Sequence, residues 1–400
     1  MHLRARLFGI GVAALAAIPL VVLGPAGFSQ AAVKPAQSVA HSCATAKPGY
    51  AACQALVRTD IVSPAAVSPN ATPSGLGPSS LQSAYALPSS TAGSGGTVAI
   101  VDAYNDPTAE ADLGVYRSQF GLPACTTANG CFKKISQTGS TTTYPKTDGG
   151  WAQEISLDID MVSAICPNCH ILLVEATSSS FANLGAAVNK AASTAGVVAI
   201  SNSYGGSDAS DSTYGSYYNH PGIAVTASSG DSGYGASYPA SSHYVTAVGG
   251  TTLTAASTTT RGWTETAWSG AGSGCSAYNT ALTGAASFST GCTKRAEADV
   301  SAVANPSTGV AVYDSTAYSG YVGWLVFGGT SVSSPIIASV YGLAGNTASI
   351  DNNYPYTHST SLFDVTSGSN GSCTTTQWCN ARVGWDGPTG LGTPNGIGAF

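Results

Sequence analysis

Short apolar runs alternate with longer helical stretches between residues 95 and 248, and this alternation constrains the fold more than any other feature. The runs have the length and the polar ends of buried parallel strands. The predicted strands cover residues 97–102, 170–175, 197–201, 223–228 and 244–248, and the predicted helices cover 106–120, 151–165 and 181–195. Such alternation predicts an α/β fold with a mainly parallel central sheet.

Polar residues follow three of the predicted strands. Asp102 ends the first strand, and residues 202–205 and 228–231 follow two others. In open parallel sheets, sites form where the carboxyl ends of the strands meet. We therefore expect functional residues at that edge of the sheet.

Residues 1–32 have the pattern of a secretion signal. Arg4 and Arg6 precede an apolar run at 7–23, and small residues suited to signal-peptidase cleavage follow it. An uncleaved membrane anchor is the alternative, because the run has nearly the length of a membrane span. No later stretch is as long and apolar. We expect the mature protein to be secreted and extracellular.

Composition excludes several classes of partner. The chain of 400 residues is 43% hydrophobic, which suffices for one large domain and a leader. Its net charge is −6 and no block of Lys or Arg occurs, so neither nucleic acid nor an anionic membrane is an expected partner. Only 8% of residues are charged, which limits charge repulsion in acid. Acid tolerance and a compositional bias of the source organism explain this low value equally well.

Ten cysteines are expected to form five disulfides, because an even number in an exported chain suggests oxidation. The predicted partners are neighbours in the sequence: Cys43 with Cys53, Cys125 with Cys131, Cys166 with Cys169, Cys275 with Cys292, and Cys373 with Cys379. The Cys166–Cys169 motif is alternatively a redox or zinc half-site, although no second motif completes a zinc site.

The strongest local signal is the string Gly328-Gly329-Thr330-Ser331-Val332-Ser333-Ser334-Pro335, which an apolar helical stretch follows. Its two glycines allow a sharp turn and the close approach of a substrate. Ser331 is then expected at a helix N-terminus, where unpaired N–H groups favour developing negative charge. This placement suits a nucleophile whose own amide helps to stabilise an oxyanion. The alternative is that Thr330 or Ser331 only caps the helix.

Two carboxylates on the predicted helix 151–165 are the candidate proton acceptor. Glu154 and Asp158 are four residues apart and therefore share a helix face. Adjacent like charges share a proton at low pH, so the pKa of one of them rises. Such a pair can accept the Ser331 proton and return it to a leaving amine. The alternative is an acidic helix N-terminus that only complements the helix dipole.

A third motif is the strand and Gly-rich turn at 227–233, which carries Asp231. By itself this is an aspartate in a turn. The three motifs together, in this order, resemble those of the sedolisin family of serine-carboxyl peptidases in the subtilisin-like superfamily, over roughly residues 95–400.

The resemblance implies a subtilisin-like three-layer α/β fold and a catalytic role for each motif. Ser331 would be the nucleophile, with Glu154 as general base and acid and Asp158 as its partner. Asp231, protonated, would complete the oxyanion hole. The edge segment that pairs with the substrate backbone would include Ser203, Tyr204 and Gly205, whereas Asp102 would be secondary and structural.

Two stretches near the C-terminus, 363–366 and 384–392, resemble the sedolisin calcium site. Ca²⁺ takes hard oxygen ligands. The implied ligands are the carboxylates of Asp364 and Asp386 and the carbonyls of Val365, Arg382 and Gly384. The alternative is a Gly-rich loop that uses aspartates in its turns, and the insertion between Cys373 and Cys379 departs from the usual spacing of the family.

The resemblance implies a secreted, acid-acting endopeptidase that cleaves peptides or proteins through an acyl-enzyme on Ser331. We expect a monomer with residues 93–400 as its peptidase domain. Sedolisins usually carry a long prodomain, so residues 33–92, which are predicted to be loop, are interpreted as an N-terminal extension or a short propeptide remnant. The alternatives are a tripeptidyl-peptidase of the same family, an inactive calcium-stabilised binding protein, and a neutral subtilisin with a histidine base such as His170.

Overall fold

β4 (Thr97–Ala103) lies inside an eight-stranded sheet, as the apolar run at 97–102 predicts. The computed structural model describes residues 1–2, 9, 38–61 and 68–400. The chain divides into two units, Met1–Ala36 and Gln37–Phe400, and all helices and strands of the described residues belong to the second. The predicted signal segment falls almost entirely outside the described residues.

The strand order of this sheet is β12-β11-β9-β7-β4-β6-β5, and β15 pairs with β11. Every neighbouring pair is parallel except β11 with β12. The other strands are β5 (Phe132–Ser136), β6 (His170–Ala176), β7 (Val197–Asn202), β9 (Ala224–Ser228), β11 (Thr246–Ala255), β12 (Trp263–Ala267) and β15 (Val300–Val303). The prediction of a mainly parallel sheet is confirmed.

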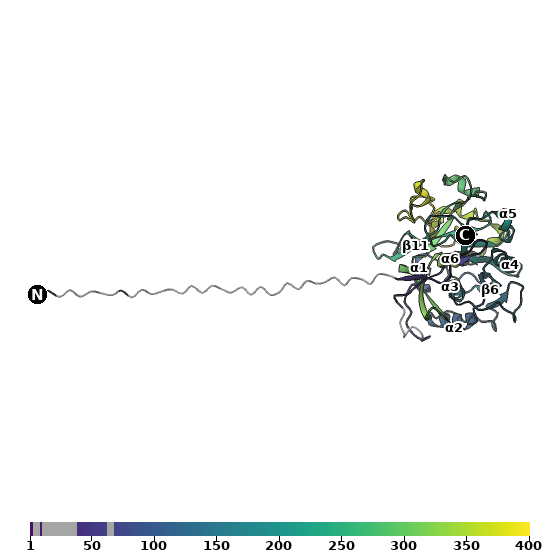
Figure 1. The fold of residues 1–400 in the computed structure, drawn as a ribbon, viewed down its shortest axis with the longest axis horizontal. Coiled ribbons are helices and arrows are strands. Elements are labelled where there is room, and N and C mark those ends of the chain that lie inside the picture. The colour runs from purple at the N-terminus through teal and green to yellow at the C-terminus, as the bar shows by residue number, and fades with distance from the viewer. Residues whose placement is uncertain (3–8, 10–37, 62–67) are drawn as a thin grey trace. The chain divides into compact units, whose positions relative to one another are not determined.

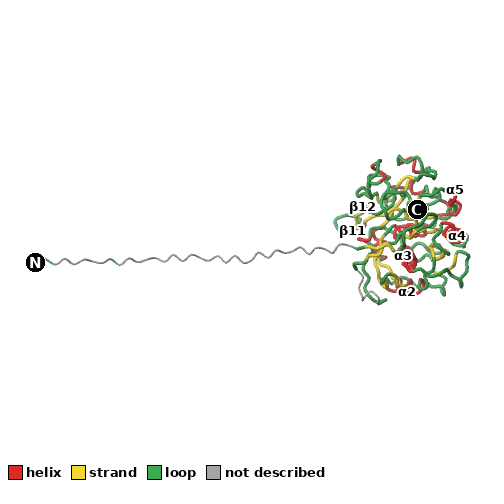
Figure 2. Tube along the Cα trace, viewed as in Figure 1, coloured by secondary structure: helices red, strands yellow, loops and turns green. Residues whose placement is uncertain are grey.

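Two hydrophobic cores cover the two faces of the sheet, because alternate residues of a strand point to opposite sides. Val98 and Ile100 belong to one core, and Ala99 and Val101 belong to the other. The first core includes residues of α1 (Pro78–Ala84), α2 (Ala109–Gln119), α3 (Gly149–Ile165) and α6 (Thr330–Ala344). The second is covered by α4 (Phe181–Ala192). The sheet thus has helices on both faces. Figure 2 colours the helices red and the strands yellow.

Helices α3 and α6 pack against each other on one face of the sheet, near the middle of the unit in Figure 1. Asp148 caps α3, because its carboxylate accepts hydrogen bonds from the amides of Gly150 and Trp151. The helix therefore begins two residues before the predicted start, and every residue from Gly150 to Ile165 is buried. Side chains that α3 and α6 present to each other are thus kept from water.

The N-terminal part of the described unit differs from the prediction. Residues 33–92 were expected to be loop, but β1 (Val39–His41), β2 (Ala52–Cys53), β3 (Leu56–Arg58) and α1 lie within them. β3 pairs with β17, in a sheet of order β1-β3-β17-β16. These strands belong to the same compact unit as the predicted peptidase domain. Two- and three-residue strands lack a hydrophobic period, so the sequence pattern did not reveal them.

The remaining elements lie mostly in the C-terminal half. β16 (Val310–Tyr318) and β17 (Tyr321–Gly328) form an antiparallel hairpin that leads directly into α6. The short strands are β8 (Tyr204–Ser207), β10 (Ser237–Tyr238), β13 (Gly274–Cys275), β14 (Ala296–Glu297), β18 (Leu362–Phe363) and β19 (Thr393–Pro394), and the short helices are α5 (Asp211–Tyr214) and α7 (Tyr354–Thr357).

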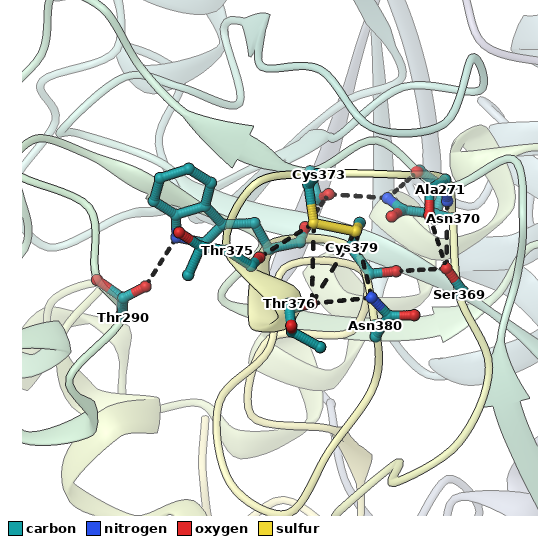
Figure 3. Close-up of a disulfide and its surroundings, with 12 residues drawn as sticks. Ala271, Thr290, Ser369, Asn370, Cys373, Thr375, Thr376, Cys379 and Asn380 are labelled. Atoms are coloured by element: carbon teal, nitrogen blue, oxygen red, sulfur yellow. Dashed lines mark hydrogen bonds between the residues drawn. A yellow bond between two sulfur atoms is a disulfide. The ribbon is translucent and has the colours of Figure 1, made fainter.

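All five predicted disulfides are present. Cys166 and Cys169 are bonded to each other, so this pair forms no zinc half-site. Figure 3 shows the Cys373–Cys379 bridge, which closes a loop on the C-terminal segment. Asn370 fixes the start of this loop, since its side-chain amide donates to the carbonyl of Ala271 over 2.6 Å.

A group of buried carboxyls lies between α2, α3 and β16, away from the strand ends where the site is expected. Asp160 accepts the amide of Tyr313, and Asp314 accepts the amide of Thr316, but each keeps one buried oxygen without a partner among the described residues. Burial, with the charge of Asp106 adding to it, raises the pKa of Asp314 to about 8. Burial likewise raises the pKa of Asp160 well above its usual value. The fold therefore favours protonated acids at this place.

We predict that the protein loses stability as pH rises from about 4 to about 8. A carboxyl whose pKa is raised in the folded state holds a proton there that the unfolded chain has released, so the free energy of unfolding falls across this window. Thermal unfolding followed against pH measures the effect, which we expect to be on the order of a few kcal/mol.

Asp314→Asn is expected to flatten this dependence, whereas Asp351→Asn, at an exposed carboxyl, is the matched control. A melting temperature that rises steadily from pH 4 to pH 8 in the wild-type protein would contradict the prediction.

Candidate active site

Ser331 lies in the first turn of α6, directly after β17. Gly329 precedes the helix with a φ of +95°, a conformation that favours glycine. Pro335 has no N–H to donate to the carbonyl of Ser331, so that carbonyl is free to accept the Ser203 hydroxyl over 3.4 Å. Ser331 is completely buried. The structure therefore has Ser331 at a helix N-terminus, as the sequence predicts.

The hydroxyl of Ser331 donates to the backbone carbonyl of Ser203 over 3.2 Å. The hydroxyl of Ser203 in turn donates to Asp158 Oδ1 over 2.8 Å. Ser203 follows β7 at the carboxyl edge of the sheet, where the strand pattern predicted polar site residues. This residue thus connects the nucleophile candidate on α6 with the carboxyls of α3.

Glu154, Asp158 and Asp102 form a cluster of three buried carboxyls. All three side chains have no exposure to solvent, and both oxygens of Glu154 and of Asp102 lack hydrogen-bond partners within the described part of the chain. Burial, followed by the charge of Asp102, raises the pKa of Glu154 and of Asp158 well above the usual range. Burial and the charge of Glu175 do the same to the pKa of Asp102.

The Ser331 hydroxyl lies near enough to Glu154 to favour its charged form and to lower its pKa in part. No well-aligned hydrogen bond joins the two groups in this state, because the hydroxyl points to Ser203. A rotation of the hydroxyl is enough to exchange one acceptor for the other. Glu154 is therefore a carboxyl within reach of the Ser331 hydroxyl.

Asp231 lies beside the start of α6, in the turn after β9. Its Oδ1 accepts the amide of Thr330 over 2.7 Å and the hydroxyl of Thr330 over 2.9 Å. Its Oδ2 is buried and has no partner among the described residues. Burial raises the pKa of Asp231 to about 7, although the bonds from Thr330 oppose the shift. Below that pH the free oxygen is a hydrogen-bond donor.

The histidines take no part in this arrangement. His220 and His243 pair with backbone carbonyls of Tyr217 and Thr280, and His170 is exposed at the start of β6. His41 lines the cleft beside the site but forms no hydrogen bond with Ser331 in the residues described. Among the described residues, none of these four histidines forms a hydrogen bond with Ser331.

A cleft with a volume of about 520 Å³ runs alongside Asp231. β8, which contains Tyr204 and Gly205, lines one side, and the turn at 229–237 lines the other. The N-terminal residues 41–54 also line the cleft, and β2 pairs antiparallel with β8 there. The edge of β8 that was predicted to bind substrate is therefore occupied by the chain's own N-terminal segment.

The predicted calcium ligands also lie together. Asp386 Oδ2 accepts the amide of Arg382 over 3.0 Å, and Asp364 Oδ2 accepts the amide of Gly384 over 2.9 Å. Val365, the fifth predicted ligand, is buried beside Asp364. Neither carboxylate forms an ion pair with a cationic side chain of the described residues. No cluster of three or more His, Cys, Asp or Glu suited to a metal occurs in that part of the chain.

Neither Asp364 nor Asp386 is paired with a cationic side chain of the described residues. A hard cation such as Ca²⁺ can bind two carboxylates and take its remaining ligands from backbone carbonyls. Burial raises the pKa of Asp386 to about 7. The oxygen set thus fits calcium by its chemistry.

The structure brings the predicted catalytic residues to one place, between α3, α6 and the turn after β9. Sequence reasoning missed the contribution of the Ser203 hydroxyl and the closeness of Asp102 to the carboxyl pair. It also missed Ala52, Cys53 and Gln54, which line the cleft. The only sequence signal for them is the Cys43–Cys53 pair, which marks a structured segment in otherwise featureless sequence.

No protein-family model matches the chain. Kumamolisin of Bacillus sp. (strain MN-32) is 28% identical over 368 residues, which is 82% of this chain. The chain spans 64% of the length of kumamolisin.

Several solved structures are similar to this chain in their fold. Pseudomonas sedolisin, a serine-carboxyl proteinase solved with two molecules of pseudo-iodotyrostatin, superposes with a TM-score of 0.67 at 27% identity, over 81% of this chain and 96% of its own. The S41 psychrophilic protease, with a TM-score of 0.54, and Sphericase, with 0.51, share the fold at 17% and 20% identity. They cover 81% and 78% of this chain and 98% and 96% of their own. The predicted subtilisin-like fold is confirmed, and the chain is similar to Pseudomonas sedolisin and to kumamolisin.

Proposed function

We propose that this protein is a secreted, acid-acting serine endopeptidase. The observation that carries the proposal is the meeting of a buried serine hydroxyl with buried, proton-holding carboxyls at one helix N-terminus. Ser331 is the nucleophile, Glu154 its base and acid, Asp158 the partner of Glu154, and Asp231 the oxyanion donor.

The reaction follows from these positions. Ser331 Oγ attacks the carbonyl carbon of a peptide bond while its proton passes to Glu154. Glu154 then gives that proton to the leaving nitrogen as the carbon–nitrogen bond breaks, which leaves an acyl-enzyme. Water attacks the ester, Glu154 takes a proton from it and returns it to Ser331, and the carboxylic product departs. Asp158 and Asp102 keep a proton available within the cluster, because three adjacent buried carboxyls do not all ionise.

The oxyanion formed in each step needs donors beside Ser331. The free Oδ2 of Asp231 donates a hydrogen bond only when it is protonated, and its pKa of about 7 provides that state in acid. The amide of Ser331, in the first turn of α6, is a second donor by its position.

We propose an endopeptidase and keep a tripeptidyl-peptidase as the alternative, because hydrolysis of an N-terminally blocked peptide distinguishes the two. Peptide or protein chains are thus the proposed substrates, and the protein is proposed to act as a monomer.

We also propose that the protein is secreted and that it binds Ca²⁺. Five disulfides suit an oxidising, extracellular environment. Among residues 38–61 and 68–400, every helix is too short or too polar to cross a membrane. The proposed Ca²⁺ ligands are Asp364, Val365, Arg382, Gly384 and Asp386. Bound there, the ion would neutralise the two carboxylates and fix the loop, away from Ser331 and its chemistry.

Ser331→Ala is expected to remove hydrolysis of an N-terminally blocked peptide, a loss of about 10³-fold or more, because no nucleophile remains. The control is Ser339→Ala on the same helix, where a buried hydroxyl without a partner is removed. That variant should keep its activity. Circular dichroism should show both variants folded. Hydrolysis by Ser331→Ala at the wild-type rate would reject the nucleophile.

The rate of peptide hydrolysis is expected to fall as pH rises through about 7. Asp231 loses its proton there, and with it the hydrogen bond to the oxyanion. The pH profile of kcat/KM measures this limb. Glu154→Gln should abolish turnover at every pH, because an amide accepts no proton. An activity optimum above neutrality that histidine substitutions remove would contradict this assignment.

Calcium is expected to raise the melting temperature. Binding to the folded state adds about 2.7 kcal/mol to the free energy of unfolding when free Ca²⁺ is about 100 times its Kd. A chelator should reverse the increase, and Asp364→Asn should remove the response. Asp351→Asn, at an exposed carboxyl, should respond like the wild type. A melting temperature insensitive to both Ca²⁺ and chelator would refute the site, whatever the activity.

A further inference from the structure

The hydroxyl of Thr330 does not cap helix α6, although the sequence allows that role. The N-cap residue is Gly329, and no side chain forms a capping bond there. Thr330 is completely buried, so its hydroxyl needs hydrogen-bond partners inside the protein. Both partners lie in the turn after β9, the turn that contains Asp231.

The directions of these two hydrogen bonds follow from their donors. The amide of Gly230 donates to Thr330 Oγ1 over 3.1 Å, so the hydroxyl oxygen accepts on that side. A hydroxyl has one proton to donate. The Thr330 hydroxyl gives that proton to Asp231 Oδ1, over 2.9 Å. The Gly230 amide therefore orients the hydroxyl toward the carboxyl of the next residue in the chain.

Oδ1 of Asp231 accepts two donors from Thr330. The amide of Thr330 donates over 2.7 Å, and the hydroxyl is the second donor. A protonated carboxyl has one O–H, which donates, and one carbonyl oxygen, which accepts. Because two donors point at Oδ1, Oδ1 is the carbonyl oxygen of the protonated acid. The proton of Asp231 then belongs on Oδ2.

Oδ2 of Asp231 lies close to the start of α6. It is buried and has no partner within the described part of the chain. A Cβ placed on Gly329 would lie 2.5 Å from it, so Oδ2 borders the backbone two residues before Ser331. Asp231 also lines the cleft. A proton on Oδ2 is thus available to a group in the cleft, whereas a proton on Oδ1 would displace a donor of Thr330.

We propose that Thr330 is a positioning residue for the reaction, and that its hydroxyl keeps the Asp231 proton on Oδ2, where that proton is donated to the oxyanion. This inference rests on the proposed function. Thr330 acts here only through Asp231. The bonds that form and break during peptide hydrolysis remain those of Ser331, Glu154 and the substrate.

The same hydroxyl also changes the acidity of Asp231. Burial, the larger cause, raises the pKa of Asp231 to about 7, and the two bonds from Thr330 oppose this shift because they favour the ionised carboxylate. Removal of the hydroxyl therefore raises the pKa further, and Asp231 keeps its proton to a higher pH. The removal also weakens the preference of the proton for Oδ2. The rate should thus fall while the pH range of protonated Asp231 becomes wider.

Three other titratable side chains face Asp231. Glu154 on α3 is close enough for the charge of Asp231 to raise its pKa. His41 and Tyr234 line the same cleft, and no Lys or Arg is among the described residues that line it. Thr330 forms hydrogen bonds with none of the three in the described part of the chain. A change of the Thr330 hydroxyl therefore acts directly on Asp231 alone.

The test compares the pH profile of kcat/KM for an N-terminally blocked peptide between the full-length wild type and Thr330→Val, in which a methyl group replaces the hydroxyl. We expect kcat to fall about tenfold with little change in KM, because the oxyanion forms only during the reaction. We expect the alkaline limb to move up by about one pH unit. Thr330→Ser, which keeps the hydroxyl, should restore both values.

Thr246→Val is the matched control. It removes another buried threonine hydroxyl that contacts α6, through the hydroxyl of Tyr341 at 3.2 Å near the other end of the helix. Its alkaline limb should coincide with that of the wild type. An NMR titration of the Asp231 carboxyl carbon, assigned by its absence in Asp231→Asn, should show the higher pKa in Thr330→Val without any turnover. If Thr330→Val does not fold, Thr330→Ala removes the same hydroxyl and takes its place.

A lower rate with an alkaline limb that stays in place or moves to lower pH would overturn this inference, since the loss would then be only structural. An unchanged kcat would also overturn it, wherever the limb lies. In both cases, hydrolysis by the wild type leaves the proposed function standing. A wild type that hydrolyses no peptide in acid would overturn both.

Discussion

The site depends on the burial of carboxyls next to a serine. Glu154, Asp158 and Asp102 lie where water does not reach them, and two of the three have no hydrogen-bond partner for either oxygen among the described residues. An ionised carboxylate in such a place is costly, so the cluster retains protons that carboxyls in water would release. A retained proton is what an acid–base catalyst without histidine requires. The helix pair α3 and α6 and the parallel sheet beneath it provide this dry environment.

The same preference for protonated acids extends beyond the site. Asp160, two residues after Asp158 on α3, and Asp314 on β16 are also buried, and burial raises their pKa values as well. Few charged residues remain on the chain, 8% in all, so acid changes its net charge little. The proposed catalysis and the predicted stability are therefore both expected to favour low pH.

Much of the fold followed from the sequence because buried parallel strands are continuous apolar runs. Thr97–Asp102 and His170–Glu175 show this pattern, and the structure has them as β4 and β6. The spacing of Glu154 and Asp158 also gave their common helix face. The residues of β1 to β3 were missed because such short strands are defined by their partners in β8 and β17, which no local pattern encodes. The closeness of Asp102 to Glu154 and Asp158 was missed for the same reason. It brings the end of β4 next to α3, which is distant in the sequence.

A carboxyl beside Ser331 is expected to keep its proton at a pH at which an ordinary carboxyl is ionised. An infrared pH titration of the protonated carboxyl band, compared between the wild type and Glu154→Gln, measures this directly. We expect a carboxyl that stays protonated above about pH 5 in the wild type, with a smaller band in the variant. Full ionisation of every carboxyl by about pH 5, with identical titrations of the two proteins, would contradict it.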